Sequence, residues 1–162
     1  MRQIDSIAKK IMTLQEAKAM IAAWRVLGKT VSFTNGCFDI LHPGHIFSLG
    51  QAAKEADYLV VGLNSDASVK RLKGPERPIN NTESRAIIIA NLVLVDAVVV
   101  FEEDTPLELI SELLPDVLVK GGDYTLEQIV GAKEVIAAGG KVIINNIVEG
   151  FSTTNLIEKI KK

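Results

Sequence analysis

The stretch Thr34-Asn35-Gly36-Cys37-Phe38-Asp39-Ile40-Leu41-His42-Pro43-Gly44-His45 decides how this chain is organised. It contains both histidines of the protein, three residues apart. The apolar run 30–33 comes directly before it, and a helical pattern follows from Ile46 to about Ala56. The polar turn therefore lies between a buried strand and the N-terminus of a helix. Free backbone N–H groups and the helix dipole favour a phosphate group at such a position.

Strand and helix patterns alternate along the rest of the chain. Apolar, β-branched runs predict strands at about 29–33, 57–63, 96–101, 117–119 and 141–145. Amphipathic patterns predict helices at about 13–27, 46–56, 66–72, 82–93, 106–114, 126–138 and 155–161. This alternation is typical of parallel sheets with right-handed crossovers. We therefore predict a Rossmann-like, doubly wound α/β fold with about five parallel strands and helices on both faces.

The chain of 162 residues is long enough for one domain with its own core. Residues 1–28 are expected to form an N-terminal arm and helix that pack on the body, and residues 29–162 a single domain. Thr13 and Glu16 have the spacing of a capping box at the start of the first helix, and Gly28 ends that helix.

Composition argues against several classes of protein. A formal net charge of −2 does not suit a general nucleic-acid binder, which usually shows a basic excess. No apolar run approaches the roughly eighteen residues that span a bilayer, and the first twenty residues lack a signal-peptide core. The single cysteine, Cys37, excludes an intrachain disulfide and fits a reducing compartment. We expect a cytoplasmic protein without nucleic-acid or membrane partners.

Polar, glycine-containing or basic segments follow four of the predicted strands. These segments are 34–45, 64–77, 120–124 and 149–154. Ligands of doubly wound sheets bind beyond the carboxyl ends of the strands, where the strand order reverses. The four segments are therefore expected to meet at one edge and to form one distributed site.

His42 and His45 are the first candidates for chemistry. Pro43 sets the φ angle for a first helical turn, and Gly44 lets a ligand approach the backbone. A spacing of three residues puts both imidazoles on one side of that turn, where they can donate hydrogen bonds to a phosphate and to charge that grows on it. Metal ligation is one alternative, although the chain has no third histidine. A capping turn with two incidental histidines is the other.

Basic side chains gather between two of the predicted helices. Lys70, Arg71, Lys73 and Arg77 lie in a stretch whose Gly-Pro and Arg-Pro pairs indicate a loop, and loops carry function more often than helix faces do. A solvated charged face is the alternative. We expect at least one of these residues to bind phosphate, without ranking Lys70 over Lys73. Arg85 is either a further phosphate contact or part of an ion pair on a helix surface.

The residues quoted above resemble a known family. Residues 35–45 look like the G-x-F-D-x-x-H-x-G-H stretch of the cytidylyltransferase-like nucleotidyltransferase superfamily. The wider set of matching segments is 64–74, 77–80, 101–106, 118–124 and 149–155. Together these segments resemble the heptose 1-phosphate adenylyltransferases, which occur alone or as the C-terminal half of a bifunctional kinase–adenylyltransferase. The resemblance extends from about Lys10 to the end. The H-x-G-H element alone indicates only the superfamily, whereas the combined set is specific to the heptose branch.

The resemblance implies transfer of AMP from ATP to D-glycero-β-D-manno-heptose 1-phosphate. The products would be pyrophosphate and ADP-heptose, a precursor of the lipopolysaccharide core. ATP and heptose 1-phosphate would be the partners, and Mg²⁺ would be the cofactor, bound mainly through the ATP phosphates. Asp39 would organise the site or contact the metal indirectly, or it would only close its own turn. Relatives of this kind associate, so a homo-oligomer is expected.

The resemblance also implies roles for single residues. The implied catalytic residues are His42, His45, Lys70 and Lys73. The implied contacts to nucleotide and phosphates are Thr34, Asn35, Gly36, Phe38, Asp39, Gly44, Arg71, Arg77, Lys120, Gly121, Asp123, Ser152, Thr153 and Thr154. The segment 152–154 would cap the last helix and hold the β- and γ-phosphates, because a helix N-terminus can serve both purposes. An ordinary turn is the alternative for the segment that begins at Lys120.

Two other functions stay open. One is a cytidylyltransferase that acts on glycerol 3-phosphate or another small phosphate ester. Those enzymes tend to carry Arg-Thr-Glu-Gly before Ser-Thr-Thr and a lysine after it, whereas this chain has Ile-Val-Glu-Gly at 147–150 and then Asn155. The missing arginine and lysine weaken this alternative without deciding which base is bound. The other is a catalytically silent nucleotide-binding module that acts through oligomerisation, against which the complete set of motifs argues.

Overall fold

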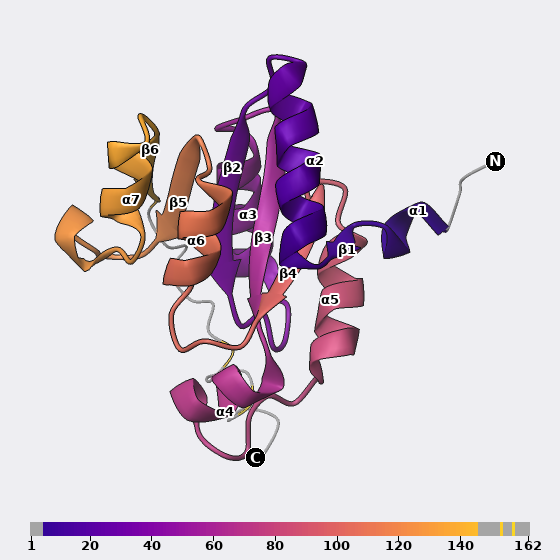
Figure 1. The fold of residues 1–162 in the computed structure, drawn as a ribbon. Coiled ribbons are helices and arrows are strands. Elements are labelled where there is room, and N and C mark those ends of the chain that lie inside the picture. Colours follow the sequence, from indigo (N-terminus) through magenta and orange to yellow (C-terminus); the bar gives the residue numbers. More distant parts are fainter. Residues whose placement is uncertain (1–4, 146–152, 154–156, 158–162) are drawn as a thin grey trace.

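The fold is a single parallel sheet with helices on both faces (Figure 1). The computed structural model describes residues 5–145, 153 and 157. The strands are β1 (Ile11–Met12), β2 (Val31–Gly36), β3 (Tyr58–Asn64), β4 (Ala97–Phe101), β5 (Val117–Gly121) and β6 (Lys141–Asn145). Their spatial order is β1-β4-β3-β2-β5-β6, and every neighbouring pair is parallel. The predicted doubly wound architecture is confirmed, with six strands where about five were expected.

The helices follow the predicted alternation with one interruption. They are α1 (Asp5–Ala8), α2 (Leu14–Val26), α3 (Pro43–Ala53), α4 (Asp66–Lys73), α5 (Thr82–Ala90), α6 (Leu107–Leu113) and α7 (Ala132–Ala137). The single helix predicted over 126–138 is wrong, because a 3₁₀ turn at Leu126–Gln128 is separated from α7 by Gly131. Gly131 has φ 84°, and an added Cβ would lie 2.7 Å from Ile110 side-chain atoms. The helix predicted at 155–161 lies outside the described residues.

The additional strand, β1, lies at the sheet edge beside β4. The backbone N–H of Val98 donates to the carbonyl oxygen of Lys10 (2.7 Å), and the Lys10 ammonium donates to the carbonyl oxygen of Val95 (2.6 Å). Two strand residues are too few to show a hydrophobic period, so the sequence pattern did not reveal this strand. The segment before α2 is thereby tied to the sheet by main-chain hydrogen bonds.

The capping box predicted at the start of α2 is confirmed. The Thr13 backbone N–H donates to the Glu16 carboxylate (2.8 Å), and the Glu16 N–H donates to the Thr13 hydroxyl oxygen (3.3 Å). Gly28 follows the helix with φ 71°. Trp24 stacks on Tyr58, with ring centroids 4.1 Å apart. These contacts fix α2 against the first residue of β3.

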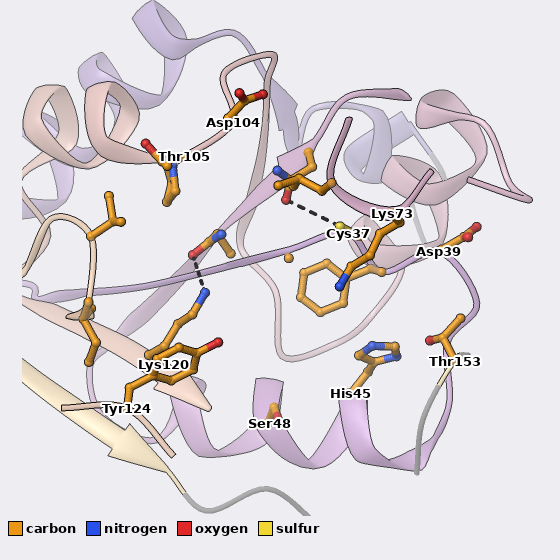
Figure 2. A pocket seen from close by; sticks show the side chains of 18 of the residues that line it. Cys37, Asp39, His45, Ser48, Lys73, Asp104, Thr105, Lys120, Tyr124 and Thr153 are labelled. Carbon is orange, nitrogen blue, oxygen red and sulfur yellow. Dashed lines mark hydrogen bonds between the residues drawn. The ribbon is translucent and has the colours of Figure 1, made fainter. Parts of the chain in front are cut away.

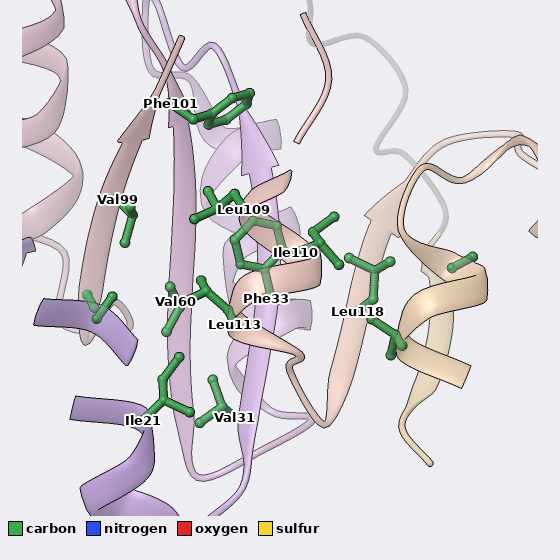
Figure 3. Packing of buried hydrophobic residues seen from close by; sticks show 14 of the residues in the cluster. Ile21, Val31, Phe33, Val60, Val99, Phe101, Leu109, Ile110, Leu113 and Leu118 are labelled. Atoms are coloured by element: carbon green, nitrogen blue, oxygen red, sulfur yellow. The ribbon is translucent and has the colours of Figure 1, made fainter. Parts of the chain in front are cut away.

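Two hydrophobic layers cover the two faces of the sheet. One layer includes Phe33, Val60 and Leu118 of the strands and packs against α2, α6 and α7 (Figure 3). The other includes Leu59 and Val61 and packs against α3 and α5. The central strands are buried on both faces, which explains their continuous apolar sequence. No helix in the described part of the chain is long and apolar enough to cross a membrane.

The strand order reverses at β2, which pairs with β3 on one side and β5 on the other. The chain leaves β2 for α3, on one face, and leaves β5 for α7, on the opposite face. The two connections diverge beyond the carboxyl ends of these strands. A crevice at this point is the usual ligand site of doubly wound sheets.

Candidate active site

A cavity of about 660 Å³ lies at the carboxyl ends of the strands (Figure 2). Segments that follow β2, β3, β4 and β5 line it, together with Thr153. The predicted site residues that line it are Asn35, Gly36, Phe38, Asp39, His42, Gly44, His45, Lys73, Arg77, Lys120 and Thr153. Residues more than a hundred positions apart in sequence are thus brought to one cavity, as the position of their segments predicted.

The two histidines form a stacked pair at the N-terminus of α3. His42 is the N-cap residue and has extended backbone angles, and Pro43 follows inside the first turn. The imidazole centroids of His42 and His45 are 3.8 Å apart, with 19° between the ring planes. The Phe38 ring meets His45 edge-on at 5.4 Å. Packing on two sides fixes the His45 ring, which points into the cavity in Figure 2.

Burial keeps this pair neutral near pH 7. Burial, with a smaller contribution from His42, lowers the pKa of His45 from 6.5 to about 4. Burial also lowers the pKa of His42. Among the described residues, the buried Nδ1 atom of His45 has no hydrogen-bond partner. A neutral imidazole carries one donor and one acceptor, so each ring of the pair can donate one hydrogen bond to a ligand.

The lowered pKa of His45 predicts an effect of pH on stability. Between pH 6.5 and about 4 the unfolded chain binds a proton at His45 that the folded chain does not bind. The free energy of unfolding should therefore fall as the pH drops through this window, with the full loss reached below about pH 4. Denaturant titrations of the wild type and of His45→Gln at a series of pH values measure this effect. A dependence equally steep in the variant would show that His45 is not its source.

Asp39 organises the loop that faces the histidines. One of its carboxylate oxygens accepts hydrogen bonds from the backbone N–H groups of Ile79 (2.8 Å) and Asn80 (3.0 Å). The other accepts a hydrogen bond from Nε of Arg77 (2.6 Å). The Asn80 side chain donates back to the Asp39 carbonyl oxygen (2.7 Å). Asp39 is 3% exposed. The carboxylate therefore binds the turn after β2 to the loop before α5 and holds the Arg77 guanidinium at the cavity wall.

The Arg85 side chain connects the segments that form the site. It is fully buried. It donates to the carbonyl oxygens of Cys37 (2.6 Å), Asn64 (2.8 Å) and Asn80 (3.0 Å). It also pairs with the Asp66 carboxylate at 2.8 Å. Neither sequence alternative, a phosphate contact or a surface ion pair, describes this position. Arg85 fixes the turn after β2, the end of β3 and the starts of α4 and α5.

The basic stretch after β3 divides into two groups. Lys70, Arg71 and Lys73 belong to the last turn of α4, so the loop predicted to begin at Lys70 begins only after Lys73. Lys73 and Arg77 line the cavity, whereas Lys70 and Arg71 do not. Arg71 instead pairs with Asp104 and donates to the carbonyl oxygen of Glu102. Residues 70, 71 and 73 are all exposed, and Lys73 is the last residue of α4, next to the loop that carries Arg77.

Some other predicted contacts do not line the cavity. They are Thr34, Gly121 and Asp123. Asp123 is exposed, and Gly121 lies next to Ser48, whose hydroxyl would be 3.6 Å from an added Cβ. Ser152 and Thr154 lie outside the described residues. The described residue between them, Thr153, donates its hydroxyl to the carbonyl oxygen of Ile40 (3.4 Å).

Several lining residues were not named as single candidates from the sequence, although most of them lie in segments that were quoted there. They are Cys37, Ser48, Asn64, Leu72, Asp104, Thr105, Pro106, Leu118, Tyr124, Gln128, Ile129 and Val130. Residues 104–106 follow β4. The rule that ligands bind beyond the carboxyl ends of the strands could therefore have predicted them. Ser48 is one helical turn after His45, on the same side of α3. Burial raises the pKa of the Cys37 thiol, which fits a small filler rather than a nucleophile.

The described residues offer little for a resident metal ion. Over 5–145, with 153 and 157, no three His, Cys, Asp or Glu side chains form a group that could hold one. Both carboxylate oxygens of Asp39 already accept hydrogen bonds from protein groups. Asp39 thus acts here as an organiser of the site.

Comparison with known proteins begins with a family match. Residues 33–159, more than half of the chain, match the family described as Cytidylyltransferase-like. The protein named "Bifunctional protein HldE" from Mesorhizobium japonicum is 57% identical over 151 residues, which are 93% of this chain and 30% of that protein. The protein of the same name from Nitrobacter winogradskyi is 59% identical over 139 residues, 86% of this chain and 28% of that protein. The chain spans about 30% of the length of the curated relatives it matches.

Solved structures share the fold. A lipopolysaccharide core biosynthesis protein from Thermoplasma volcanium GSS1 superposes with a TM-score of 0.60 and 31% identity, over 75% of this chain and 98% of that one. Pantoate-beta-alanine ligase from Francisella tularensis superposes with a TM-score of 0.59 and 14% identity, over 93% of this chain and 76% of that one. At 14% identity the likeness shows the fold alone.

Proposed function

Because the chain belongs to the cytidylyltransferase-like family, we propose that it is a nucleotidyltransferase that transfers AMP from ATP to D-glycero-β-D-manno-heptose 1-phosphate. The products are ADP-heptose and pyrophosphate. The stacked pair of neutral histidines at the N-terminus of α3, which faces a cavity with basic residues, carries the proposal of nucleotidyl transfer. The match of motifs to the heptose branch supports the choice of acceptor, as does the identity of 51–59% to proteins named HldE.

The chemistry suits these residues. A phosphate oxygen of the acceptor is already anionic, so the attack on the α-phosphorus needs no strong general base. Catalysis then depends on in-line positioning and on neutralising charge at the α-phosphate. His42 and His45 donate hydrogen bonds there, and the free N–H groups of α3 add their partial positive charge.

The leaving pyrophosphate needs positive charge of its own. Lys73 and Arg77 line the cavity, Lys73 on the side of His45 (Figure 2), and Thr153 adds a hydroxyl. ATP enters as its magnesium complex, in which the cation is bound mainly by phosphate oxygens. Asp39 and Arg85 take no part in bond making, but they hold the turn and the loop that carry these groups. Self-association stays a prediction from the resemblance.

A matrix of substrates tests the proposed function. Release of pyrophosphate is measured with ATP, CTP, GTP and UTP against heptose 1-phosphate, glycerol 3-phosphate and other sugar phosphates, with Mg²⁺ present. The expected result is turnover with ATP and heptose 1-phosphate and formation of ADP-heptose, identified by mass spectrometry. Turnover confined to CTP and glycerol 3-phosphate would contradict the proposal and favour the cytidylyltransferase alternative. Absence of turnover with every pair would favour a silent binding module.

A further inference from the structure

The cavity has a second cationic end, formed by Lys120 at the end of β5. Figure 2 shows Lys120 and Tyr124 on one side of the cavity and Lys73, His45 and Thr153 on the other. Ser48 of α3 lies between the two groups. The two ends come from opposite sides of the point where the strand order reverses, because Lys120 follows the β5 branch and the histidines follow β2.

The Lys120 ammonium has few compensating partners in the protein. Its ammonium donates a long hydrogen bond to the side-chain oxygen of Asn35 (3.4 Å) and lies 5.9 Å from the centre of the Tyr124 ring. Within the described part of the chain, no carboxylate forms an ion pair with Lys120. Burial lowers the pKa of its ammonium. Lys120 is half-buried, and lysines withdrawn from water are usually paired, because an unpaired charge is costly to desolvate.

The chemistry of this end favours an anionic ligand group. A nucleobase or a sugar hydroxyl is neutral, and an amide or hydroxyl side chain would bind it without the desolvation cost of an ammonium. A phosphate group would supply the missing counter-charge, and a hydrogen bond between charged groups is about twice as strong as one between neutral groups. Lys120 is therefore better explained by a ligand phosphate than by its bond to Asn35.

The geometry of phosphoryl transfer indicates which phosphate it is. In an in-line displacement the attacking and leaving oxygens lie on opposite sides of the phosphorus. In the proposed function the pyrophosphate leaves toward Lys73 and Thr153, with the α-phosphate at the histidines. The attacking group must then arrive from the side of Lys120. We infer that Lys120 binds the phosphate group of the acceptor and holds it for attack on the α-phosphorus.

The step that Lys120 assists is balanced without any further reactant. A phosphate oxygen of the acceptor forms a bond to the α-phosphorus of ATP, and the bond from that phosphorus to the α,β-bridging oxygen breaks. Pyrophosphate leaves with the electron pair of that bond. The ammonium of Lys120 transfers no proton in this step and acts by binding and by orientation. This assignment rests on the proposed function, since it needs two phosphate-bearing substrates in one cavity.

Replacement of Lys120 should change the KM of one substrate and leave that of the other nearly unchanged. Lys120→Met keeps most of the length of the side chain and removes its charge. We expect the KM for heptose 1-phosphate to rise by about 10–100-fold, as for the loss of one charged hydrogen bond, and the KM for ATP to change less than about threefold. Lys120→Arg should restore part of the acceptor affinity, because it restores the cation. Lys133→Met, at an exposed position of α7 outside the cavity, is the matched control and should leave both constants unchanged.

Direct binding distinguishes failure of this inference from failure of the proposed function. Calorimetry measures the affinity of the wild type and of Lys120→Met for heptose 1-phosphate and for unphosphorylated heptose, with α,β-methylene ATP bound. The variant should lose affinity for the phosphorylated sugar only. An equal rise of KM for ATP, or unchanged acceptor affinity with a normal circular dichroism spectrum, would overturn the role of Lys120. A wild type that makes no nucleotide sugar would instead overturn the proposed function.

Discussion

Replacing His45 with alanine is expected to lower kcat by about 10²–10³-fold, as for the loss of one preorganised hydrogen-bond donor. The ring is held between Phe38 and His42 and points into the cavity, so its donor is in place before charge grows on the α-phosphate. Steady-state rates of pyrophosphate release measure the effect. KM for ATP should change less than kcat, because the hydrogen bond strengthens in the transition state.

Two further variants make the His45 result specific. His45→Gln keeps an N–H donor on a shorter, flexible side chain and should recover part of the lost rate. Phe47→Ala removes a half-exposed ring from the same turn of α3, outside the cavity, and should leave the rate unchanged. A rate near that of the wild type in His45→Ala, with a normal thermal transition, would remove His45 from the mechanism.

Replacing Arg85 with methionine is expected to lower the free energy of unfolding by at least about 3 kcal/mol, because three buried acceptors would each lose a donor at about 1–3 kcal/mol. Methionine fills part of the volume but donates no hydrogen bond. The carbonyl oxygens of Cys37, Asn64 and Asn80 would each lose a donor, and buried acceptors without partners are costly. Urea titration followed by circular dichroism measures the change. The turnover of the remaining folded protein should also fall, because three segments of the site lose their common anchor.

An exposed arginine provides the control for Arg85. Arg25 also pairs with a carboxylate, that of Asp116, and donates to a carbonyl oxygen, that of Leu114, but its side chain is 41% exposed. Arg25→Met should cost about 1 kcal/mol or less, as is usual for surface ion pairs. Arg85→Lys keeps the charge but not the planar fork of donors, so it should recover only a minor part of the stability. Equal costs for Arg85→Met and Arg25→Met would contradict the role of Arg85 as an anchor.

The fold could be predicted because its signals are local in sequence. The continuous apolar runs around Phe33 and Val60 predicted strands buried on both faces, and Thr13 and Glu16 predicted a cap that the structure contains. The position of the main cavity followed from the rule that ligands bind beyond the carboxyl ends of parallel strands. That rule needs only the order of elements along the chain.

Other features depend on contacts that no local pattern contains. Arg85 looks like a helix-surface residue because its neighbours Glu83 and Ser84 are polar, and only the packed structure shows it fully buried. Lys70 and Lys73 could not be ranked from the sequence, because residues three apart share one side of a helix, and only the structure shows that Lys73 lines the cavity and Lys70 does not. Strand β1 can be recognised only from its pairing with β4, because its two residues show no pattern of their own.

The hydrogen bonds that assemble the cavity span long distances in sequence. Asn80 and Asp39 are 41 residues apart, Lys120 and Asn35 are 85 apart, and Thr153 and Ile40 are 113 apart. Such contacts close late in folding, because each must first overcome the entropy of a long loop. A ligand that touches all these segments has no binding site on a partly folded chain. Such a ligand therefore stabilises only the native state, by an amount that grows with its concentration relative to Kd, and the thermal midpoint should rise accordingly.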